Sequence, residues 1–249
     1  MRSFAERRAL LGVSSVTAPL PARPDQLIEI YLQDCYHVSH DDGPTAAVPE
    51  MVVVGPQSYR RTRLILSGSI HVFTIRFQPG GFYALFGIPM SALVNEGVAA
   101  GDVIGPAAAG LRDAVLFARD FDARVAAAEL WLGRRLEIPC QIDRVCRLAA
   151  ALHRSGGRLA VRALAQRAEL SDRQFTRRFE RQVGLTPKLF ARTVRLNAVL
   201  EAKARSPRTT WTELVHGAGY ADQAHFVRDC RALAGSAPAE FFAEWAPGR

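Results

Sequence analysis

The sequence has few cysteines, and they are not spaced as in a metal site or a disulfide framework. Cys35, Cys140, Cys146 and Cys230 are scattered over 249 residues and form no CxxC pair. This spacing argues against a zinc finger or a small disulfide-stabilised fold, and a reducing compartment, the cytoplasm, fits it best. The chain also lacks a run of about 18 apolar residues, so we predict no membrane-spanning helix.

The signature motifs of several enzyme classes are also missing. The sequence contains no GxxxxGK[ST], GxGxxG, GxSxG or HExxH pattern, so Gly80-Gly81 after Pro79 is interpreted as a strand-to-helix turn rather than a phosphate loop. We therefore predict no catalytic residue, no cofactor and no bound metal. A metal-binding cupin-type enzyme with a vestigial helical domain is kept as the alternative. That alternative rests on residue types that zinc or iron uses, namely His37, His40, Asp41, Asp42 and His71.

Lysine is scarce, and the basic charge is carried almost wholly by arginine. Of 32 basic residues only Lys188 and Lys203 are lysines, and the formal net charge is +8. Residues 1–155 hold 16 basic and 15 acidic residues, whereas residues 156–249 hold 16 and 9. Because the positive excess belongs to the C-terminal third, that part is the one suited to a polyanionic partner.

The N-terminal half has the texture of a β domain. Arg7-Arg8 and the apolar residues after them superficially resemble an export signal, but three hydroxyl side chains interrupt the stretch, so residues 1–24 are interpreted as a poorly ordered lead-in. In residues 25–136 the runs LIEIYL, MVVV, RLIL and IHVFTIRF predict strands, the last with one apolar face. Helical segments that begin near Gly81, Pro106 and Asp120 are expected to cover the sheet.

The remaining chain is predicted to be helical. Residues 137–157 are assigned to a linker helix that ends in a hinge at Gly156-Gly157, and residues 158–249 form a separate domain. In that domain a short amphipathic helix precedes Ser171, which predicts the N-cap of the helix SDRQFTRRFERQV. Its apolar side chains share one face, and the opposite stripe carries Arg173, Thr176 and Arg177. A helix-turn-helix reads base edges in the major groove with such a stripe.

The same arrangement recurs further along the chain. Thr186 and Pro187 precede a long helix over 188–205, and a short helix over 210–216 ends at a glycine-rich turn. Asp222 then predicts the N-cap of another helix, and GLTP and GSAP close the two units in the same way. This pattern indicates an internal duplication.

Residues 158–243 resemble the DNA-binding domain of AraC/XylS-type transcription regulators. The segments LAQRAELSDRQFTRRFERQVGLTPKLF, RLNAVLEA and ELVHGAGYADQAHFVRDCRALAGSAPAEF follow the order and spacing of that family. The chain departs from the family at Cys230, usually a large aromatic residue, at Val215, usually alanine, and at Ala237, usually threonine or serine, which predicts a less tightly packed second unit. The N-terminal part resembles, through Val54-Gly55-Pro56 and IRFQPGGFYALFGIP, the degenerate cupin-like β domain fused to such regulators.

The resemblance implies an α+β protein with a small cupin-like β domain, covering helices, and an all-α domain of two helix-turn-helix units joined by a central helix. It implies a sequence-specific transcription regulator that binds double-stranded DNA, tuned through its N-terminal domain. A small-molecule effector and a homodimer are left open. The expected base contacts are Arg173, Thr176, Arg177, Gln223, His225 and Arg228. The expected phosphate contacts are Ser171, Thr186, Lys188, Arg192 and Arg231.

Overall fold

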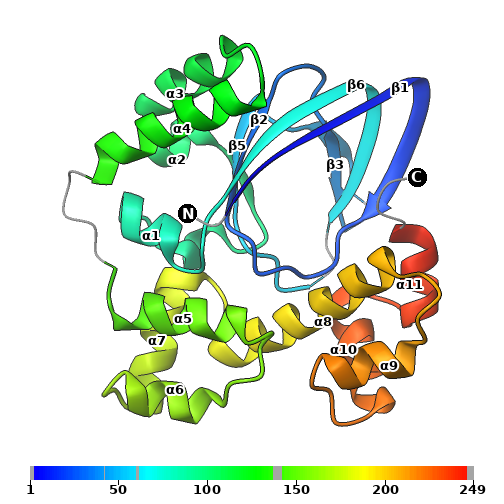
Figure 1. The fold of residues 1–249 in the computed structure, drawn as a ribbon. Coiled ribbons are helices and arrows are strands. Elements are labelled where there is room, and N and C mark those ends of the chain that lie inside the picture. The colour runs from blue at the N-terminus through cyan, green and yellow to red at the C-terminus, as the bar shows by residue number, and fades with distance from the viewer. Residues whose placement is uncertain (1–2, 42, 60–61, 137–141, 246–249) are drawn as a thin grey trace.

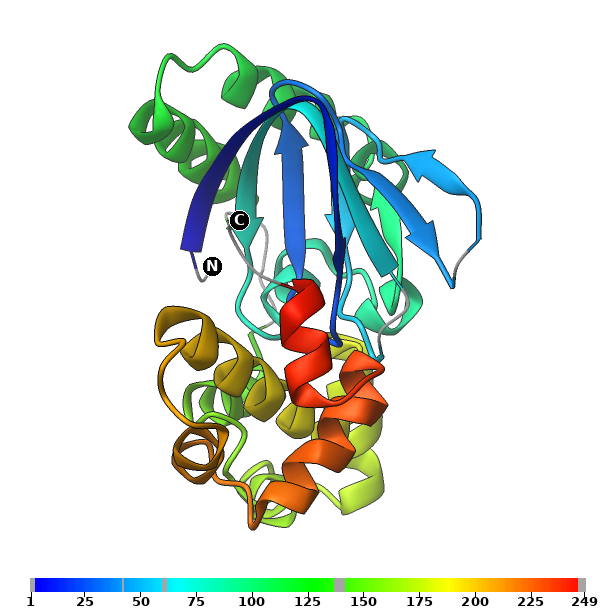
Figure 2. The same ribbon diagram turned by 90° about the vertical axis from the view of Figure 1, so that its right-hand side faces the viewer.

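The computed structural model describes residues 3–41, 43–59, 62–136 and 142–245. Within these ranges, residues 3–136 form a seven-stranded sheet that curves into a half-barrel and the helices that cover it, and residues 142–245 form a helical half (Figure 1). Figure 2 shows from the side that the sheet and the helical half form two layers of the molecule. The predicted α+β architecture is therefore confirmed.

Strand β6 (Thr62–Arg76) is the centre of the sheet, and the strands that pair within the described residues are all antiparallel. One edge of β6 pairs with β1 (Ser3–Pro19), and the other edge pairs with β2 (Leu27–Tyr31) and β3 (His37–His40). The outer strands are β4 (Thr45–Ala47), β5 (Met51–Val54) and β7 (Gly97–Ala99). The runs RLIL and IHVFTIRF, predicted as separate strands, are thus two parts of β6.

Strand β1 corrects the interpretation of residues 1–24 as a poorly ordered lead-in. It pairs with β6 from Ser3 opposite Arg76 to Pro19 opposite Arg63, with register shifts in its middle. Most of its side chains are exposed, among them Leu10 and Val13. An edge strand with little burial shows no alternation of apolar and polar residues, so the sequence carried no strand signal there.

Both faces of β6 are buried from Val72 to Ile75, which corrects the prediction of a single apolar face for this strand. Phe73 and Ile75 point to one core and Val72 to the other, and all three are fully buried. The helical segments that cover the first face are α1 (Gly81–Phe86), η1 (Met90–Leu93), α2 (Ala100–Ile104), α3 (Ala107–Leu116) and α4 (Phe121–Leu136). The other face lines the inside of the half-barrel around Tyr31 and Tyr36.

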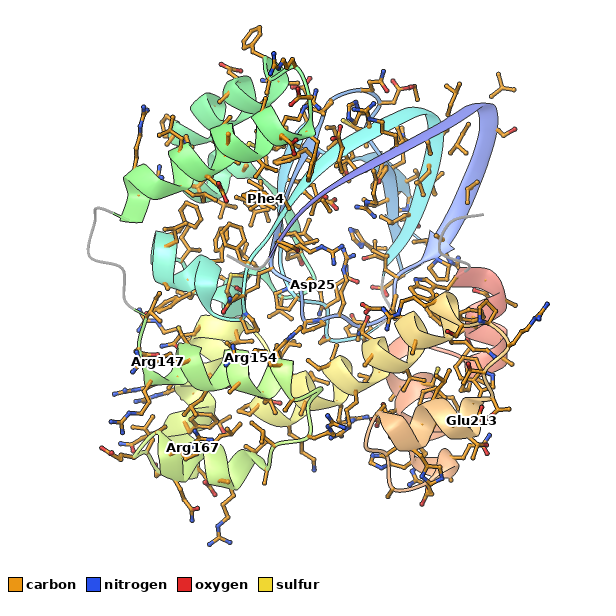
Figure 3. The ribbon with its side chains drawn as sticks, in the orientation of Figure 1. Phe4, Asp25, Arg147, Arg154, Arg167 and Glu213 are labelled. Atoms are coloured by element: carbon orange, nitrogen blue, oxygen red, sulfur yellow. The ribbon has the colours of Figure 1, made fainter. Side chains whose placement is uncertain are left out.

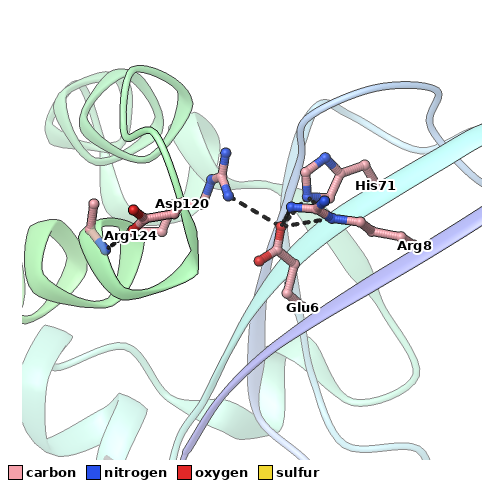
Figure 4. Close-up of polar contacts among 6 residues, drawn as sticks. Glu6, Arg8, His71, Asp120 and Arg124 are labelled. Atoms are coloured by element: carbon pink, nitrogen blue, oxygen red, sulfur yellow. Dashed lines mark hydrogen bonds and ion pairs between the residues drawn. The ribbon is translucent and has the colours of Figure 1, made fainter.

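A polar cluster at Glu6 connects β1 and β6 with α4 (Figure 4). The Glu6 carboxylate accepts hydrogen bonds from Arg8 at 2.9 Å and from Arg124 at 3.2 Å, and it contacts the His71 ring. Burial opposes the charge on Glu6, but the hydrogen bonds from His71 and Arg8 and the charge of Arg124 hold its pKa below the ordinary value. His71 is thus part of a structural contact.

The helical half consists of two packed units. The first contains α5 (Arg144–Arg154), α6 (Val161–Arg167) and α7 (Asp172–Val183), and the second contains α9 (Trp211–Gly217), α10 (Gln223–Ala234) and α11 (Pro238–Trp245). The central helix α8 (Pro187–Arg205) contributes Phe190 and Val194 to the first core and Leu196 and Leu200 to the second. Each unit therefore has its own apolar core, and α8 joins them.

The turn at Gly156-Gly157, predicted as a hinge, is packed against α8. Gly157 is buried with φ of +74°, and a side chain there would overlap the backbone of Ala191. Only glycine fits such a conformation and such a close approach without strain. Helix α5 before it supplies Val145, Leu148 and Leu152 to the core of the first unit.

One short segment, residues 20–26, lies between the half-barrel and both helical units. The Ala22 N–H donates to the Leu233 carbonyl at 2.7 Å, and the Ala22 carbonyl accepts from Asn197 Nδ2 at 2.7 Å. Four residues on, Gln26 Nε2 donates to the Val183 carbonyl at 3.2 Å. Both residues are buried, so these hydrogen bonds fix the position of the half-barrel relative to the two helical units.

Candidate nucleic-acid interface

The first helical unit has the geometry of a helix-turn-helix. Helix α6 ends at Arg167, and the chain turns through Glu169, whose φ is +57°, into α7. The Ser171 hydroxyl accepts from the Gln174 N–H, and the Gln174 side chain returns to the Ser171 N–H, which forms a capping box and confirms the predicted N-cap. Figure 3 shows that arginines such as Arg147, Arg154 and Arg167 also lie on α5 and α6.

Helix α7 divides into an exposed N-terminal half and a docked C-terminal end. Arg173 and Arg177 are exposed and Thr176 is half-buried, whereas Phe175 and Phe179 are fully buried. The amphipathic pattern therefore predicted the two faces correctly. Two exposed guanidinium groups one turn apart are available to an external hydrogen-bond acceptor.

The C-terminal end of α7 packs against the β domain and α5, which the sequence pattern did not predict. Gln182 is buried, and its Nε2 donates to Asp143 Oδ2 at 2.7 Å while Cys146 Sγ lies 3.2 Å from its Oε1. The Arg181 guanidinium carbon lies 5.7 Å from the centre of the Tyr83 ring of α1. These contacts depend on residues far away in the sequence.

The second unit repeats the first. Asp222 Oδ1 accepts from the His225 N–H at 2.6 Å, which confirms the predicted N-cap of α10. Phe226 and Cys230 are fully buried, and burial together with the charge of Asp229 raises the pKa of Cys230 to about 12. The expected contact residues Gln223, Arg228 and Arg231 are exposed, and His225 is half-buried.

A groove of about 620 Å³ lies between the two units, lined by residues 157–161 and by side chains of α8 and α10. It brings together four expected contact residues, Lys188, Arg192, His225 and Arg228. It also contains Arg158 and Arg195, which the sequence patterns did not select. Arg158 lies in the turn before α6, and Arg195 lies on α8 three residues beyond Arg192. Among the described lining residues the acidic side chain is Asp229, so the groove has a positive excess.

Three of the expected phosphate contacts already have structural partners. The Arg192 guanidinium pairs with the buried carboxylate of Asp229 at 2.8 Å. The Thr186 hydroxyl accepts from the Leu189 N–H at 3.1 Å and caps α8, as Ser171 caps α7. Lys188 and Arg231, by contrast, are exposed.

The half-barrel contains a small cavity of about 60 Å³. Its polar lining includes Arg23, Glu29, Tyr31, His40 and Gln57. Within the described residues neither Nε of Arg23 nor Oε1 of Gln57 has a hydrogen-bond partner. Buried polar atoms of this kind are normally satisfied, so the cavity is chemically suited to a polar molecule.

The residues considered for a metal site do not come together in the described ranges. No group of three His, Cys, Asp or Glu residues in the described part of the chain is placed to hold an ion, and Asp42 lies outside it. His40 contacts the Thr62 hydroxyl at 3.0 Å and His71 contacts Glu6. A membrane-crossing helix is likewise not found in the described ranges.

Two family models match the sequence. Residues 164–244 match a helix-turn-helix domain family, and residues 21–99 match a domain of unknown function, DUF6597. A comparison with curated proteins finds no match. The helical half thus contains a helix-turn-helix domain.

Solved structures of ToxT from Vibrio cholerae have a similar fold. One covers 99% of this chain and 100% of its own, with a TM-score of 0.54 and 10% identity. A second, from strain O395, covers 98% and 99%, with a TM-score of 0.53 and 9% identity. A third, also from O395, contains (E)-4-(8-methylnaphthalen-1-yl)but-3-enoic acid and covers 98% and 100%, with a TM-score of 0.52 and 9% identity. The similarity extends over both layers of the molecule.

Proposed function

We propose that this protein is a sequence-specific DNA-binding transcription regulator of the cytoplasm. The proposal starts from an AraC-type helix-turn-helix domain attached to a β domain with the ToxT fold. The observation that carries the proposal is the duplication of one exposed surface. The N-terminal halves of α7 and α10 both present basic side chains, and a positively charged groove lies between the two units. A DNA backbone is the polyanion that such a surface fits.

In the proposed complex α7 and α10 enter successive major grooves, about 34 Å apart along the duplex. Base edges are read by Arg173, Thr176 and Arg177 in one groove, and by Gln223, His225 and Arg228 in the next. The backbone contacts are Ser171, Thr186, Lys188, Arg192 and Arg231. Since one chain holds both recognition helices, this mode of binding does not require a dimer.

The test is selection of the preferred duplex from a random library, followed by a gel-shift titration at physiological salt. We expect a preferred sequence with two half-sites one helical turn apart and an affinity at least about 1000-fold above that for a scrambled duplex. Failure to retard any duplex would leave a protein-interaction module as the better description. Iron or zinc at near-unit stoichiometry in the purified protein would instead favour the cupin-type enzyme.

We also propose that the half-barrel cavity holds a small anionic effector. Burial lowers the pKa of Arg23, and an anion beside its guanidinium would favour the charged form. The carboxylic acid in a ToxT structure supports this class of ligand. A drug-sized acid, however, needs a pocket of about 300 Å³ or more, whereas this cavity measures about 60 Å³. We therefore propose a short-chain carboxylate.

This second proposal is tested by thermal unfolding in sodium acetate against sodium chloride at equal ionic strength. Binding to the folded state alone raises the midpoint of unfolding. We expect acetate to raise it in the natural protein and to have no such effect in Arg23→Gln. Equal midpoints in the two salts for the natural protein would contradict the assignment of the ligand class.

A further inference from the structure

The two helix-turn-helix units have separate cores, so their relative placement depends on what crosses between them. The core of the first unit and the core of the second share α8 but contain different buried residues. The long helix α8 alone sets the distance between the two units. Side-chain contacts are needed to fix the rotation of one unit relative to the other about the axis of α8. Two arginines of the groove make such contacts.

Arg158 connects the turn before α6 with the end of α9. Its Nε donates to the Ser155 carbonyl at 2.9 Å, and its Nη1 lies 3.4 Å from the Gly217 carbonyl of the second unit. Its aliphatic stem packs against Gly219, where a side chain would crowd Arg158 Cδ at 2.9 Å. One guanidinium therefore bridges the two units.

Arg195 makes the second connection, from the middle of α8. Its Nη1 donates to the Gly157 carbonyl at 3.0 Å, and its guanidinium lies 5.5 Å from the centre of the Tyr220 ring. Tyr220 is buried in the second unit and packs against Phe226 in the first turn of α10. Arg195 thus contacts the turn of one unit and the aromatic core of the other.

The chemistry of these contacts depends on arginine rather than on positive charge alone. The planar guanidinium has donors pointing in several directions and a face that stacks on aromatic rings, so it can bridge two backbone segments at once. A lysine ammonium retains the charge but does not reproduce this geometry. The acceptors at Ser155, Gly157 and Gly217 are neutral carbonyls, so the contacts do not neutralise either cation.

We propose that Arg158 and Arg195 are positioning residues that hold the two recognition helices in one relative orientation and thereby set the half-site spacing accepted on DNA. The inference rests on the proposed DNA-binding function and deepens it. Two rigidly linked helices match only half-sites at the corresponding helical phase, whereas loosely linked helices tolerate other phases.

The experiment measures the affinity of the full-length protein for its selected duplex and for duplexes with one, two or three base pairs inserted between the half-sites. Three inserted base pairs rotate the far half-site by about 100°. We expect the three-pair insertion to lower the affinity of the natural protein about tenfold or more. In Arg158→Lys and Arg195→Lys the same insertion should lower the affinity about threefold or less, relative to the affinity of each variant for the uninserted site.

The control is Arg162→Lys, which changes an exposed arginine of α6 that does not line the groove. It should keep the natural spacing profile. Circular dichroism and thermal midpoints establish that the variants are folded, and Arg158→Ala, at an exposed position, serves as a further variant with the same expected loss of spacing discrimination. The slope of log affinity against log salt should be unchanged in the lysine variants, since each keeps its charge.

Three results would overturn the inference. The lysine variants could keep the natural spacing profile, they could lose affinity equally at every spacing, or the natural protein could tolerate all insertions. Each of these leaves the proposed DNA-binding function intact, because the natural protein still binds its selected site. Absence of any retarded duplex would instead contradict the proposed function itself.

Discussion

Two groups of arginines in the helical half differ in the partners of their guanidinium groups. Arg158, Arg192 and Arg195 donate to carbonyls or to Asp229 and are part of the packed structure. Arg173, Arg177 and Arg228 are exposed on the recognition helices. In the proposed complex Arg158 and Arg195 shape the surface, Arg192 contacts a phosphate beside its partner Asp229, and the second group makes the base contacts. Substitutions in the two groups should therefore have different signatures.

Arg177 is the clearest case of a proposed base contact. If its guanidinium forms a bidentate pair with guanine, Arg177→Ala should cost about 1–3 kcal/mol on the selected duplex, with the loss concentrated at one base pair. Binding to scrambled DNA should barely change. Titrations against the two duplexes at two salt concentrations measure both effects.

Lys188→Ala is the matched control, because Lys188 is exposed and assigned to a phosphate. It should weaken binding to all sequences alike and reduce the salt slope by about 1. An equal loss for Arg177→Ala on selected and scrambled DNA would reassign Arg177 to the backbone. A loss under about 0.5 kcal/mol on both would mean that it is only a solvated surface residue.

Gly157 and Gly156 give a second prediction at the residue scale. Both have positive φ, but a side chain at Gly157 would also overlap Ala191, whereas one at Gly156 has open space. Gly156→Ala should therefore cost about 1 kcal/mol of the free energy of unfolding, from backbone strain alone. Gly157→Ala should cost about 2 kcal/mol more, since α8 or the turn must move. Urea denaturation measures both values, and equal losses would contradict the close packing of the turn.

At the scale of elements, α5 belongs to the first helix-turn-helix unit by its contacts. Asp143 shows this in one side chain, because its carboxylate accepts both from the Cys146 N–H at 3.0 Å, as the N-cap of α5, and from Gln182 Nε2 of α7 at 2.7 Å. The segment predicted as a linker helix thus also packs into the core of the first unit and positions α7. We propose that the helical domain begins at α5 rather than at residue 158.

Two substitutions of Asp143 separate its role as the N-cap of α5 from its hydrogen bond with Gln182 of α7. Asp143→Ser keeps a capping hydroxyl but does not reach Gln182, so it should cost about 1 kcal/mol through the lost hydrogen bond. Asp143→Ala removes both and should cost about 2 kcal/mol. Thermal or urea unfolding distinguishes the two variants, and identical losses would mean that the contact with α7 contributes little.

At the scale of the whole molecule, charge distinguishes the two layers and one segment joins them. The C-terminal third carries most of the positive excess, and residues 20–26 tie both of its units to the half-barrel. Leu20 and Arg23 of this segment also line the cavity. A ligand in the cavity would therefore contact the segment that holds the recognition helices.

The charge distribution predicts a steep salt dependence. Each neutralised phosphate contributes about −0.9 to the slope of log affinity against log salt, so several contacts give roughly −4 to −8. Gel-shift or fluorescence titrations between low and physiological salt measure the slope. A flat dependence would remove DNA binding as the main function.

The domain proposal predicts how fragments behave. Residues 142–249 retain α5 and should fold and bind the selected site, whereas residues 158–249 lose four buried side chains of the first core and should be markedly less stable. Circular dichroism and gel-shift titration of the two fragments check this. Equal stability would place α5 outside the domain.

The sequence by itself determined the local features of this protein. The N-caps at Ser171 and Asp222, the buried faces of α7 and α10 and the duplicated units follow from residue type and helical period, which act within a few residues. Tertiary structure decided what depends on distant partners. It made Ser3–Pro19 a strand through pairing with β6, turned a predicted hinge into a packed turn, and placed Arg158 and Arg195 between the units. Such features leave no periodic signal, because their energy comes from contacts between residues far apart in the chain.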